Sequence, residues 1–336
     1  MTDVSAQSRV HGLLLGFAVG DALGAPAAGI PGGAFLSHFG RIRSFVRNPL
    51  HPYLGHLEAG QFTENTELLL DAARDYAATG GIDRDRRIKS LTDWAKRVTS
   101  DPTNARWPGP TTLEGARRLA EGSAPNPGSA YGSVGAAYRC LPIAVVSECP
   151  RLALDVQEEA RLTDTHPESI ACAVILTLCL HQVLKGTSIE EAAQHSLQRV
   201  QQVCPSEELS TLCANALSSD EDLEDLSRRF GTGARCRETL PLSFAIASQN
   251  YASFSDAIAK AAGCYKSDRD VAAGGPWSRE TAATNGGNTD GIAAIVGALL
   301  GALHGAEVVL EYWSNVEGRD RIREIAERLY RASILH

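Results

Sequence analysis

Two short clusters of oxygen-bearing side chains contain the residues of this sequence that are best suited to chemistry. The first reads Thr63-Glu64-Asn65-Thr66, and the second reads Asn288-Thr289-Asp290. Carboxylate, amide and hydroxyl oxygens are the ligands that a hard cation such as Mg²⁺ prefers. This chemistry makes five residues candidate metal ligands: Thr63, Glu64, Asn65, Asn288 and Asp290.

Each cluster also suits the start of a helix without any ligand. Thr63 or Asn65 could serve as an N-cap with an acid close behind it. Asp290 would be stabilised by the dipole at a helix N-terminus. Either cluster alone is a weak indication of a site. Together, beside the glycine-rich helices described next, the two clusters indicate a site more strongly than a pair of caps.

Glycine recurs every fourth residue near both ends of the chain, at positions 12, 16, 20 and 24 and again at 297, 301 and 305. Each glycine inside a helix costs about 1 kcal/mol relative to alanine, and a spacing of four places all of them on one face. We therefore predict that helices 7–24 and 289–304 pack backbone against backbone at the centre of the fold. Asp21 lies within the first of these runs.

A third glycine-rich stretch, residues 128–135, leads into a predicted helix. Such a loop can present backbone N–H groups to a phosphate, although it lacks the lysine of a nucleoside-triphosphate-binding loop. His166 stands before Pro167, where a structural role and a binding role are both open. The candidate ligand-binding residues of these loops are Gly132, Ser133, Gly135, His166, Gly286 and Gly287.

Composition limits the class of protein. The 336 residues carry a formal net charge of −8, which argues against non-specific nucleic-acid binding. The eight cysteines include no C-x-x-C pair and suit a reducing compartment, so we expect a cytoplasmic protein. The longest apolar runs, 12–20 and 291–303, are too short to span a bilayer.

Apolar residues recur at helical spacing along most of the chain, and no alternating pattern long enough for a sheet occurs. The sequence predicts one all-α domain over residues 1–336, with a core at about 8–332 and a polar surface excursion at 204–236. The expected helices are 7–24, 65–79, 84–99, 112–121, 133–147, 152–163, 167–185, 188–203, 239–248, 253–266, 289–304 and 318–332.

Five motifs carry a resemblance to a known family: G-D-A-L-G at 20–24, G-Q-F-T-E-N-T-E at 60–67, G-A-A-Y-R-C-L-P at 135–142, L-T-D-T-H-P at 162–167 and the glycine-rich run at 286–305. The chain resembles the ADP-ribosylglycohydrolase family over roughly residues 8–305. The resemblance implies an all-α cytosolic fold and hydrolysis of the bond between ADP-ribose and a protein side chain. It also implies magnesium or manganese, and it implies ADP-ribose, a related phosphorylated ribose or an ADP-ribosylated protein as partner.

The sequence departs from the family's pattern at the metal motifs. The first motif usually reads Thr-Asp-Asp-Thr, and here Glu64 and Asn65 stand at its acidic positions. The second usually reads Asp-x-Asp, and here Asn288 replaces the first acid. Many members carry a supporting acid shortly after G-D-A-L-G, where this chain has Pro26-Ala27-Ala28. Two carboxylates leave the charge of two divalent ions under-neutralised, so we expect one ion rather than two, or none.

Three functions are compatible with this pattern. The first is a divergent hydrolase of a ribosyl glycosidic bond, with Glu64 and Asp290 as catalytic residues. The second is a non-catalytic relative that binds ADP-ribose, a nucleotide or an ADP-ribosylated protein. The third is a structural or interaction protein on the same scaffold. The surviving acids favour the first function, and the amides together with the missing acid favour the second.

Overall fold

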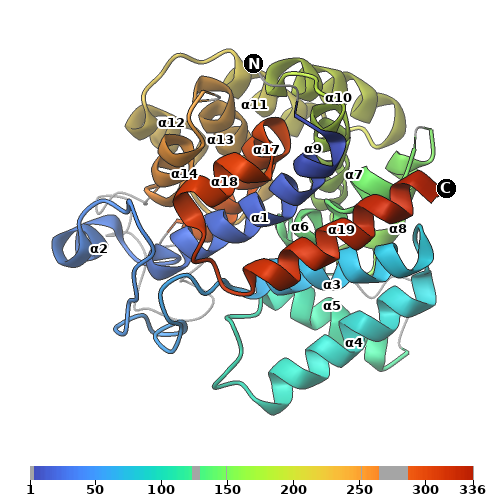
Figure 1. Ribbon diagram of the computed structural model, residues 1–336, viewed down its shortest axis with the longest axis horizontal. Helices are drawn as coiled ribbons and strands as arrows, with labels where there is room; N and C mark the ends of the chain where they lie inside the picture. Colours follow the sequence, from blue (N-terminus) through green and yellow to red (C-terminus); the bar gives the residue numbers. More distant parts are fainter. Residues whose placement is uncertain (1–3, 123–128, 149, 251, 265–286, 336) are drawn as a thin grey trace.

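The two glycine-rich helices lie side by side at the centre of the molecule (Figure 1). The computed structural model describes residues 4–122, 129–148, 150–250, 252–264 and 287–335. It places α1 (Ala6–Gly24) antiparallel to α17 (Thr289–His304). A Cβ atom built on Gly12 would lie 2.0 Å from the carbonyl oxygen of Gly301, and one on Gly16 would lie 2.0 Å from that of Gly297. The predicted contact between backbones, called the glycine seam below, is confirmed.

The other helices surround this pair, and the described residues form no β-sheet, as an all-α fold requires. After the short 3₁₀ turn Ala25–Ala27, the helices in chain order are α2 (Gly32–Phe39), α3 (Glu64–Thr79), α4 (Arg84–Ser100), α5 (Pro110–Ala120), α6 (Gly135–Cys140), α7 (Ile143–Val146), α8 (Leu152–Ala160), α9 (Pro167–Leu184), α10 (Ile189–Val203), α11 (Glu207–Leu217), α12 (Leu223–Phe230), α13 (Cys236–Gln249), α14 (Phe254–Ala262), α18 (Ala306–Trp313) and α19 (Arg319–Leu335).

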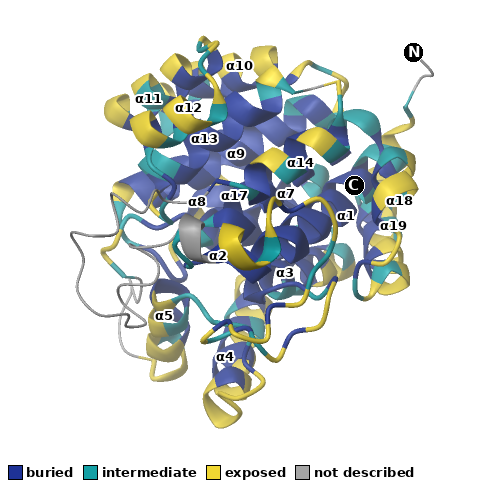
Figure 2. Ribbon diagram, turned by 90° about the vertical axis from the view of Figure 1, so that its left-hand side faces the viewer, coloured by how far each residue is buried: buried dark blue, intermediate teal, exposed yellow. Residues whose placement is uncertain are grey.

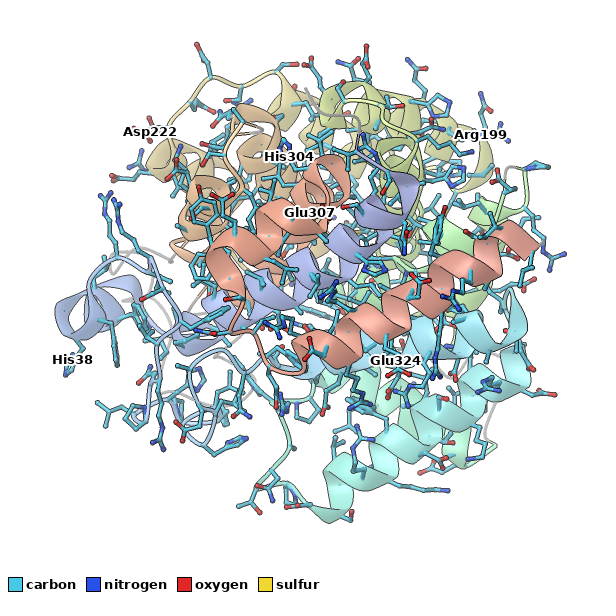
Figure 3. The ribbon with its side chains drawn as sticks, in the orientation of Figure 1. His38, Arg199, Asp222, His304, Glu307 and Glu324 are labelled. Atoms are coloured by element: carbon cyan, nitrogen blue, oxygen red, sulfur yellow. The ribbon has the colours of Figure 1, made fainter. Side chains whose placement is uncertain are left out.

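Burial follows this arrangement from the centre outward. The central helices α1, α9 and α17 are buried around most of their circumference (Figure 2). Charged side chains such as those of Asp222 and Glu324 project from the outer helices (Figure 3). Residues 6–27 and 167–184 are long and apolar enough to cross a membrane, but 94% and 83% of them are buried within the molecule. A core helix has the same composition, so these segments are weak evidence for a membrane span.

The structure differs from the predicted excursion at residues 204–236. This stretch forms α11 and α12, and each helix turns an apolar face into the main core. Leu209, Cys213, Leu226 and Phe230 are all buried there. The high content of acids and serines suggested a surface loop because polar residues dominate the outer faces of both helices. The sequence reading also missed α2 and α18, and it joined α6 and α7 into one helix across Pro142.

The glycine seam leads to a first prediction. Gly16→Ala should lower the free energy of unfolding by at least about 1–3 kcal/mol, because the new methyl group would overlap a backbone carbonyl that cannot rotate away. Gly81→Ala is the matched control, since no atom lies within 4 Å of the site of its Cβ. Thermal unfolding of both variants measures the effect, and equal melting temperatures would contradict a packed seam.

Candidate functional site

The acid of the first glycine helix holds the start of α3. Asp21 is completely buried, and its carboxylate accepts four hydrogen bonds from two threonines. The N–H groups of Thr63 and Thr66 donate at 3.2 and 3.0 Å, and their hydroxyl groups donate at 2.8 and 2.5 Å. The N-terminus of a helix favours a negative charge. Asp21 therefore fixes α3 against the end of α1.

The two predicted clusters meet at this place, although more than 200 residues separate them. The Asn65 amide Nδ2 donates to the Asp290 carboxylate at 3.1 Å. The Thr289 hydroxyl donates to the Gly24 carbonyl at 2.8 Å, which ties the start of α17 to the end of α1. The structure thus brings Thr63, Asn65 and Asp290 into one group.

Glu64 joins the same group and also holds a neighbouring loop. Its backbone N–H donates to the Arg106 carbonyl at 3.1 Å, and its Oε1 accepts from the Gly109 N–H at 2.8 Å. Its residue exposure is 8%, so a small part of Glu64 reaches solvent. Asp21, Glu64 and Asp290 are called the acidic cluster below.

Asn288 points to a different set of partners. Its Nδ2 donates to the Tyr138 hydroxyl at 3.2 Å and to the Thr239 hydroxyl at 3.0 Å. The Tyr138 hydroxyl fills the space beside Gly291, where a Cβ atom would lie only 2.0 Å from it. A threonine or serine at position 291 would therefore displace Tyr138.

Burial dominates the electrostatics of the acidic cluster. It raises the pKa of Asp21, and the four donors oppose this rise. Burial and then the charges of Asp290 and Asp21 raise the pKa of Glu64 well above its usual range. Burial and then the charge of Asp21 raise the pKa of Asp290 to about 7. The three carboxylates are thus close enough to repel one another, and the group would favour a cation or a hydrogen-bond donor.

Comparison with known proteins identifies the family of the chain. The family model for ADP-ribosylglycohydrolase matches residues 2–335. The chain belongs to the ADP-ribosylglycohydrolase family. It is 32% identical to the ADP-ribosyl-[dinitrogen reductase] glycohydrolase of Rhodospirillum rubrum over 60% of this chain and 67% of that protein. It is 26% identical to an uncharacterized protein of Archaeoglobus fulgidus over 96% of each chain.

A solved structure shows the same fold. The protein of an ADP-ribosylglycohydrolase-related protein complex superposes with a TM-score of 0.74 and covers 98% of this chain and 99% of its own. Its sequence identity of 22% supports the fold alone. The all-α architecture predicted from the motifs is therefore confirmed.

The oxygen atoms of this family member do not fit a two-ion metal centre. Asp21 uses its carboxylate to bind α3, and Asn65 directs an amide nitrogen toward Asp290. Asn288 directs its nitrogen toward Tyr138 and Thr239. Among the described residues, no three His, Cys, Asp or Glu side chains are arranged to hold a metal. Of the acids in the two predicted clusters, Glu64 and Asp290 are left to offer charged oxygens to a cation.

The position of the missing family acid lies beside the acidic cluster. Ala28 is buried, and the N–H of the next residue, Gly29, donates to the Gly287 carbonyl at 2.9 Å. His51 holds Ala28 from the other side, with Nε2 at 2.8 Å from its carbonyl. The segment is therefore placed close to α17, where Ala28 contributes only a methyl group.

The tautomer of His51 follows from its partners. Nδ1 accepts hydrogen bonds from the N–H groups of Tyr53 and Leu54 at 3.1 and 3.0 Å. Because Nδ1 accepts, Nε2 must carry the proton that it donates to Ala28. Burial lowers the pKa of His51 to about 4. The ring is thus neutral at physiological pH and holds the loop that contains Ala28.

Some backbone N–H groups of the candidate phosphate loop, described here over residues 129–135, already donate to carbonyl groups of the protein. The N–H of Ser133 donates to the Tyr131 carbonyl at 2.8 Å, and that of Val134 donates to the Ala234 carbonyl at 3.1 Å. Gly135 begins α6, so the first-turn N–H groups of this helix are the remaining candidate donors. Gly132 packs against His166: a Cβ atom on it would lie 3.1 Å from the ring.

The other candidate binding residues have structural contacts. His166 is the N-cap of α9, since its Nδ1 accepts from the Glu168 N–H at 3.2 Å. Gly287 packs closely against Cys264, where a Cβ atom would lie 2.3 Å from the carbonyl oxygen. Gly286 lies outside the described residues. These contacts explain the glycines and the histidine without a ligand, and ligand binding at these positions stays a prediction.

Sequence reasoning left out three residues that the geometry places at the site. Asp21 was noted only as a polar neighbour of the glycines, and its signal was a lone acid inside an apolar helix. Tyr138 and Thr239 bind Asn288, but nothing in their sequence surroundings distinguishes them from core residues. Their role depends on the packing of α6 and α13 against the start of α17.

The buried His51 predicts a pH dependence of stability. Its folded pKa of about 4 lies below the ordinary 6.5, so protonation favours the unfolded chain. The contribution of neutral His51 to the free energy of unfolding is complete above pH 6.5. It decreases by about 3 kcal/mol in total as the pH falls to 4. His51→Asn should lose stability less steeply than the native protein over this window. Urea unfolding between pH 7 and 4.5 measures both slopes, and parallel slopes would show that His51 is not held neutral.

Proposed function

We propose that this protein binds an ADP-ribosyl group or a related phosphorylated ribose and does not hydrolyse ADP-ribosyl-arginine. One observation carries the proposal: Asn65 donates a hydrogen bond to Asp290, at a position where the family usually places a second carboxylate. The acid that would hold a cation beside Asp290 is thus replaced by a donor that satisfies Asp290 directly.

The proposed loss of hydrolysis follows from what cleavage of a glycosidic bond needs. The bond breaks when the sugar is polarised and a water molecule is held in place for attack at the anomeric carbon. In this chain Asp21 holds α3, Glu64 holds the loop at 106–109, and Ala28 has no polar group. The remaining carboxylate oxygens can orient the hydroxyl groups of a ribose, which requires acceptors but no metal.

The exposed aromatic residue of the glycine-rich loop, with the arginine beside it, is the proposed site for the nucleotide part of the ligand; the two residues are called the rim below. Tyr131 is 39% exposed on the glycine-rich loop, and the guanidinium of Arg235 lies 5.2 Å from the centre of its ring. An exposed aromatic ring can stack on a base, and an arginine can pair with a phosphate. The first turn of α6 begins four residues after Tyr131. We propose that this rim binds the adenosine diphosphate part of the ligand.

A second candidate function is the divergent hydrolase. The observation that favours it is the proximity of two buried acids, because the charge of Asp290 contributes to the raised pKa of Glu64. In this case Glu64 and Asp290 would hold a single magnesium or manganese ion, which would supply the polarising charge. An ADP-ribosylated protein is the proposed partner in both cases. The net charge of −8 supports a protein that does not bind nucleic acid, and the cysteines without a C-x-x-C pair support the proposed cytoplasmic location; no membrane partner is proposed.

Binding and turnover can be measured separately. Calorimetry should detect ADP-ribose binding to the native protein without added metal. The same preparation should release no ADP-ribose from an ADP-ribosylated arginine peptide in the presence of magnesium or manganese. Turnover at typical enzyme rates of about 1–10³ s⁻¹, abolished by Glu64→Gln, would replace the proposal with the second candidate. If neither binding nor turnover is observed, both candidates fail.

Metal affinity provides an independent test of the charge argument. Asn65→Asp combined with Asn288→Asp should tighten magnesium binding by at least about tenfold, since it restores two carboxylates around the start of α17. Asn215→Asp, at an exposed position of α11, is the control for an unspecific charge effect. Tight binding of two ions by the native protein in a calorimetric titration would show that the charge argument is wrong.

A further inference from the structure

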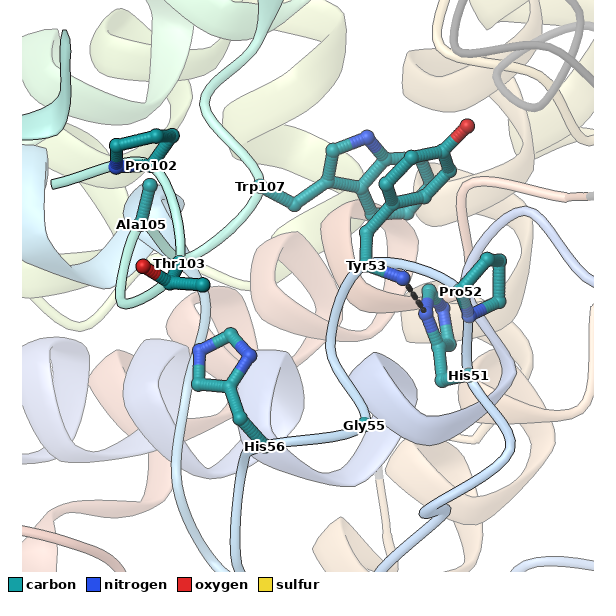
Figure 4. Close-up of a pocket in the computed structure, with 9 residues that line it drawn as sticks. All are labelled: His51, Pro52, Tyr53, Gly55, His56, Pro102, Thr103, Ala105 and Trp107. Carbon is teal, nitrogen blue, oxygen red and sulfur yellow. Dashed lines mark hydrogen bonds between the residues drawn. The ribbon is translucent and has the colours of Figure 1, made fainter.

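A cavity outside the acidic cluster is lined in part by the loop that Glu64 holds. Its volume is about 280 Å³, and its walls come from residues 51–56 and 102–107 (Figure 4). Whole small-molecule sites usually measure about 300–1,000 Å³. This cavity, called the aromatic pocket below, is therefore the size for one part of a ligand rather than for a complete dinucleotide.

The pocket is attached to the acidic cluster through the loop that Glu64 holds. Trp107 lies between Arg106 and Gly109, the two residues that exchange hydrogen bonds with Glu64 at 3.1 and 2.8 Å. The backbone of Trp107 has a φ of 55°, a left-handed conformation that is unusual for a bulky residue. Such strain persists only where the surroundings hold it. The two bonds to Glu64 restrain the backbone on both sides of Trp107.

The walls of the pocket suit a flat ring with polar edges. The rings of Tyr53 and Trp107 stack at 5.3 Å with an interplanar angle of 18° and form one side. His56 and Thr103 lie on the opposite side (Figure 4). The Thr103 hydroxyl donates to Asp101, so its oxygen remains an acceptor toward the pocket. The imidazole of His56 offers both a donor and an acceptor.

Charge distinguishes the candidate occupants. None of the nine lining residues is an aspartate, a glutamate, a lysine or an arginine. A guanidinium would enter without a carboxylate to pair with it, whereas a neutral heterocycle needs only stacking and hydrogen bonds. Glu64 is hydrogen-bonded to the loop that carries Trp107, so a ribose bound at the acidic cluster could direct the group on its anomeric carbon toward the aromatic pocket.

We propose that the aromatic pocket binds a neutral heteroaromatic base linked to C1 of the ribose. This inference rests on the proposed function, since it requires the ribose to lie at the acidic cluster. It extends that function by assigning the protein a ribosyl base as ligand, in preference to a ribosylated arginine.

Two probes that differ only in the base test the inference. Inosine 5′-monophosphate carries a base on C1, and ribose 5-phosphate does not. Calorimetry should show at least about fivefold tighter binding of the nucleotide to the native protein, the lower end of what stacking of one base contributes. Trp107→Ala should reduce this ratio to about one and leave the affinity for ribose 5-phosphate unchanged. Trp107→Phe should retain most of the preference, and Tyr312→Ala, an exposed aromatic residue on α18, should retain all of it.

Three results would overturn the inference. The first is equal affinity of the native protein for both probes, and the second is equal weakening of both by Trp107→Ala. The third is an ADP-ribosylated arginine peptide that loses as much affinity from Trp107→Ala as inosine 5′-monophosphate does.

Failure of the proposed function is recognised separately, by titrating free hypoxanthine and following the indole N–H signal of Trp107 by NMR. A shift of this signal without binding of either ribose 5-phosphate or ADP-ribose would support the pocket and refute the ribose site. Binding of ribose 5-phosphate without a shift would refute the pocket alone.

Discussion

The contact between the backbones of α1 and α17 determines the geometry of the rest of the molecule. Because no side chains separate the two helices, their backbones are in direct contact and leave little freedom for one helix to shift against the other. Gly20 and Gly24 face Ala293 and Thr289, so the last turn of α1 lies against the first turn of α17. This places Asp21 and Asp290 on neighbouring backbones. The acidic cluster is therefore a consequence of the packing, and α3 joins it by using Asp21 as the acceptor for its first turn.

Because the geometry of the site depends on helix packing, the fold can be kept when individual side chains of the site differ. The hydrogen bonds that assemble the site use Asp21, the two threonines at the start of α3 and the hydroxyl of Thr289. Each of these side chains makes its hydrogen bond in this structure. Two of the departures described above, Asn65 and Asn288, stand next to Thr66 and Thr289 and keep a hydrogen-bonding side chain without a negative charge. Ala28, by contrast, offers no polar group. Such substitutions alter the affinity for a cation far more than they alter the stability of the helices.

The sequence predicted the features that arise from local spacing. Glycine at every fourth residue predicted the seam, and the oxygen-rich starts of α3 and α17 predicted the group formed by Asn65 and Asp290. It did not predict α11 and α12, because their few buried residues are outnumbered by polar ones at helical spacing. Nor did it predict the aromatic pocket. Tyr53 and Trp107 are more than fifty residues apart in loops without periodicity, so only the tertiary structure brings their rings together.

Glu64 shows why a surviving acid is weak evidence for catalysis. In sequence it stands at an acidic position of the family's metal motif and so suggests a retained active site. In the structure, its Oε1 and its own N–H hold the loop at 106–109 against α3, and this loop carries the strained Trp107. Selection for the position of Trp107 would preserve a carboxylate at residue 64 even without a metal or a reaction. A glutamate also reaches this loop better than an aspartate, because its carboxylate lies one methylene farther from the backbone. The exchange of Asp for Glu, which weakens the fit to a metal centre, thus has a physical explanation in the loop that it supports.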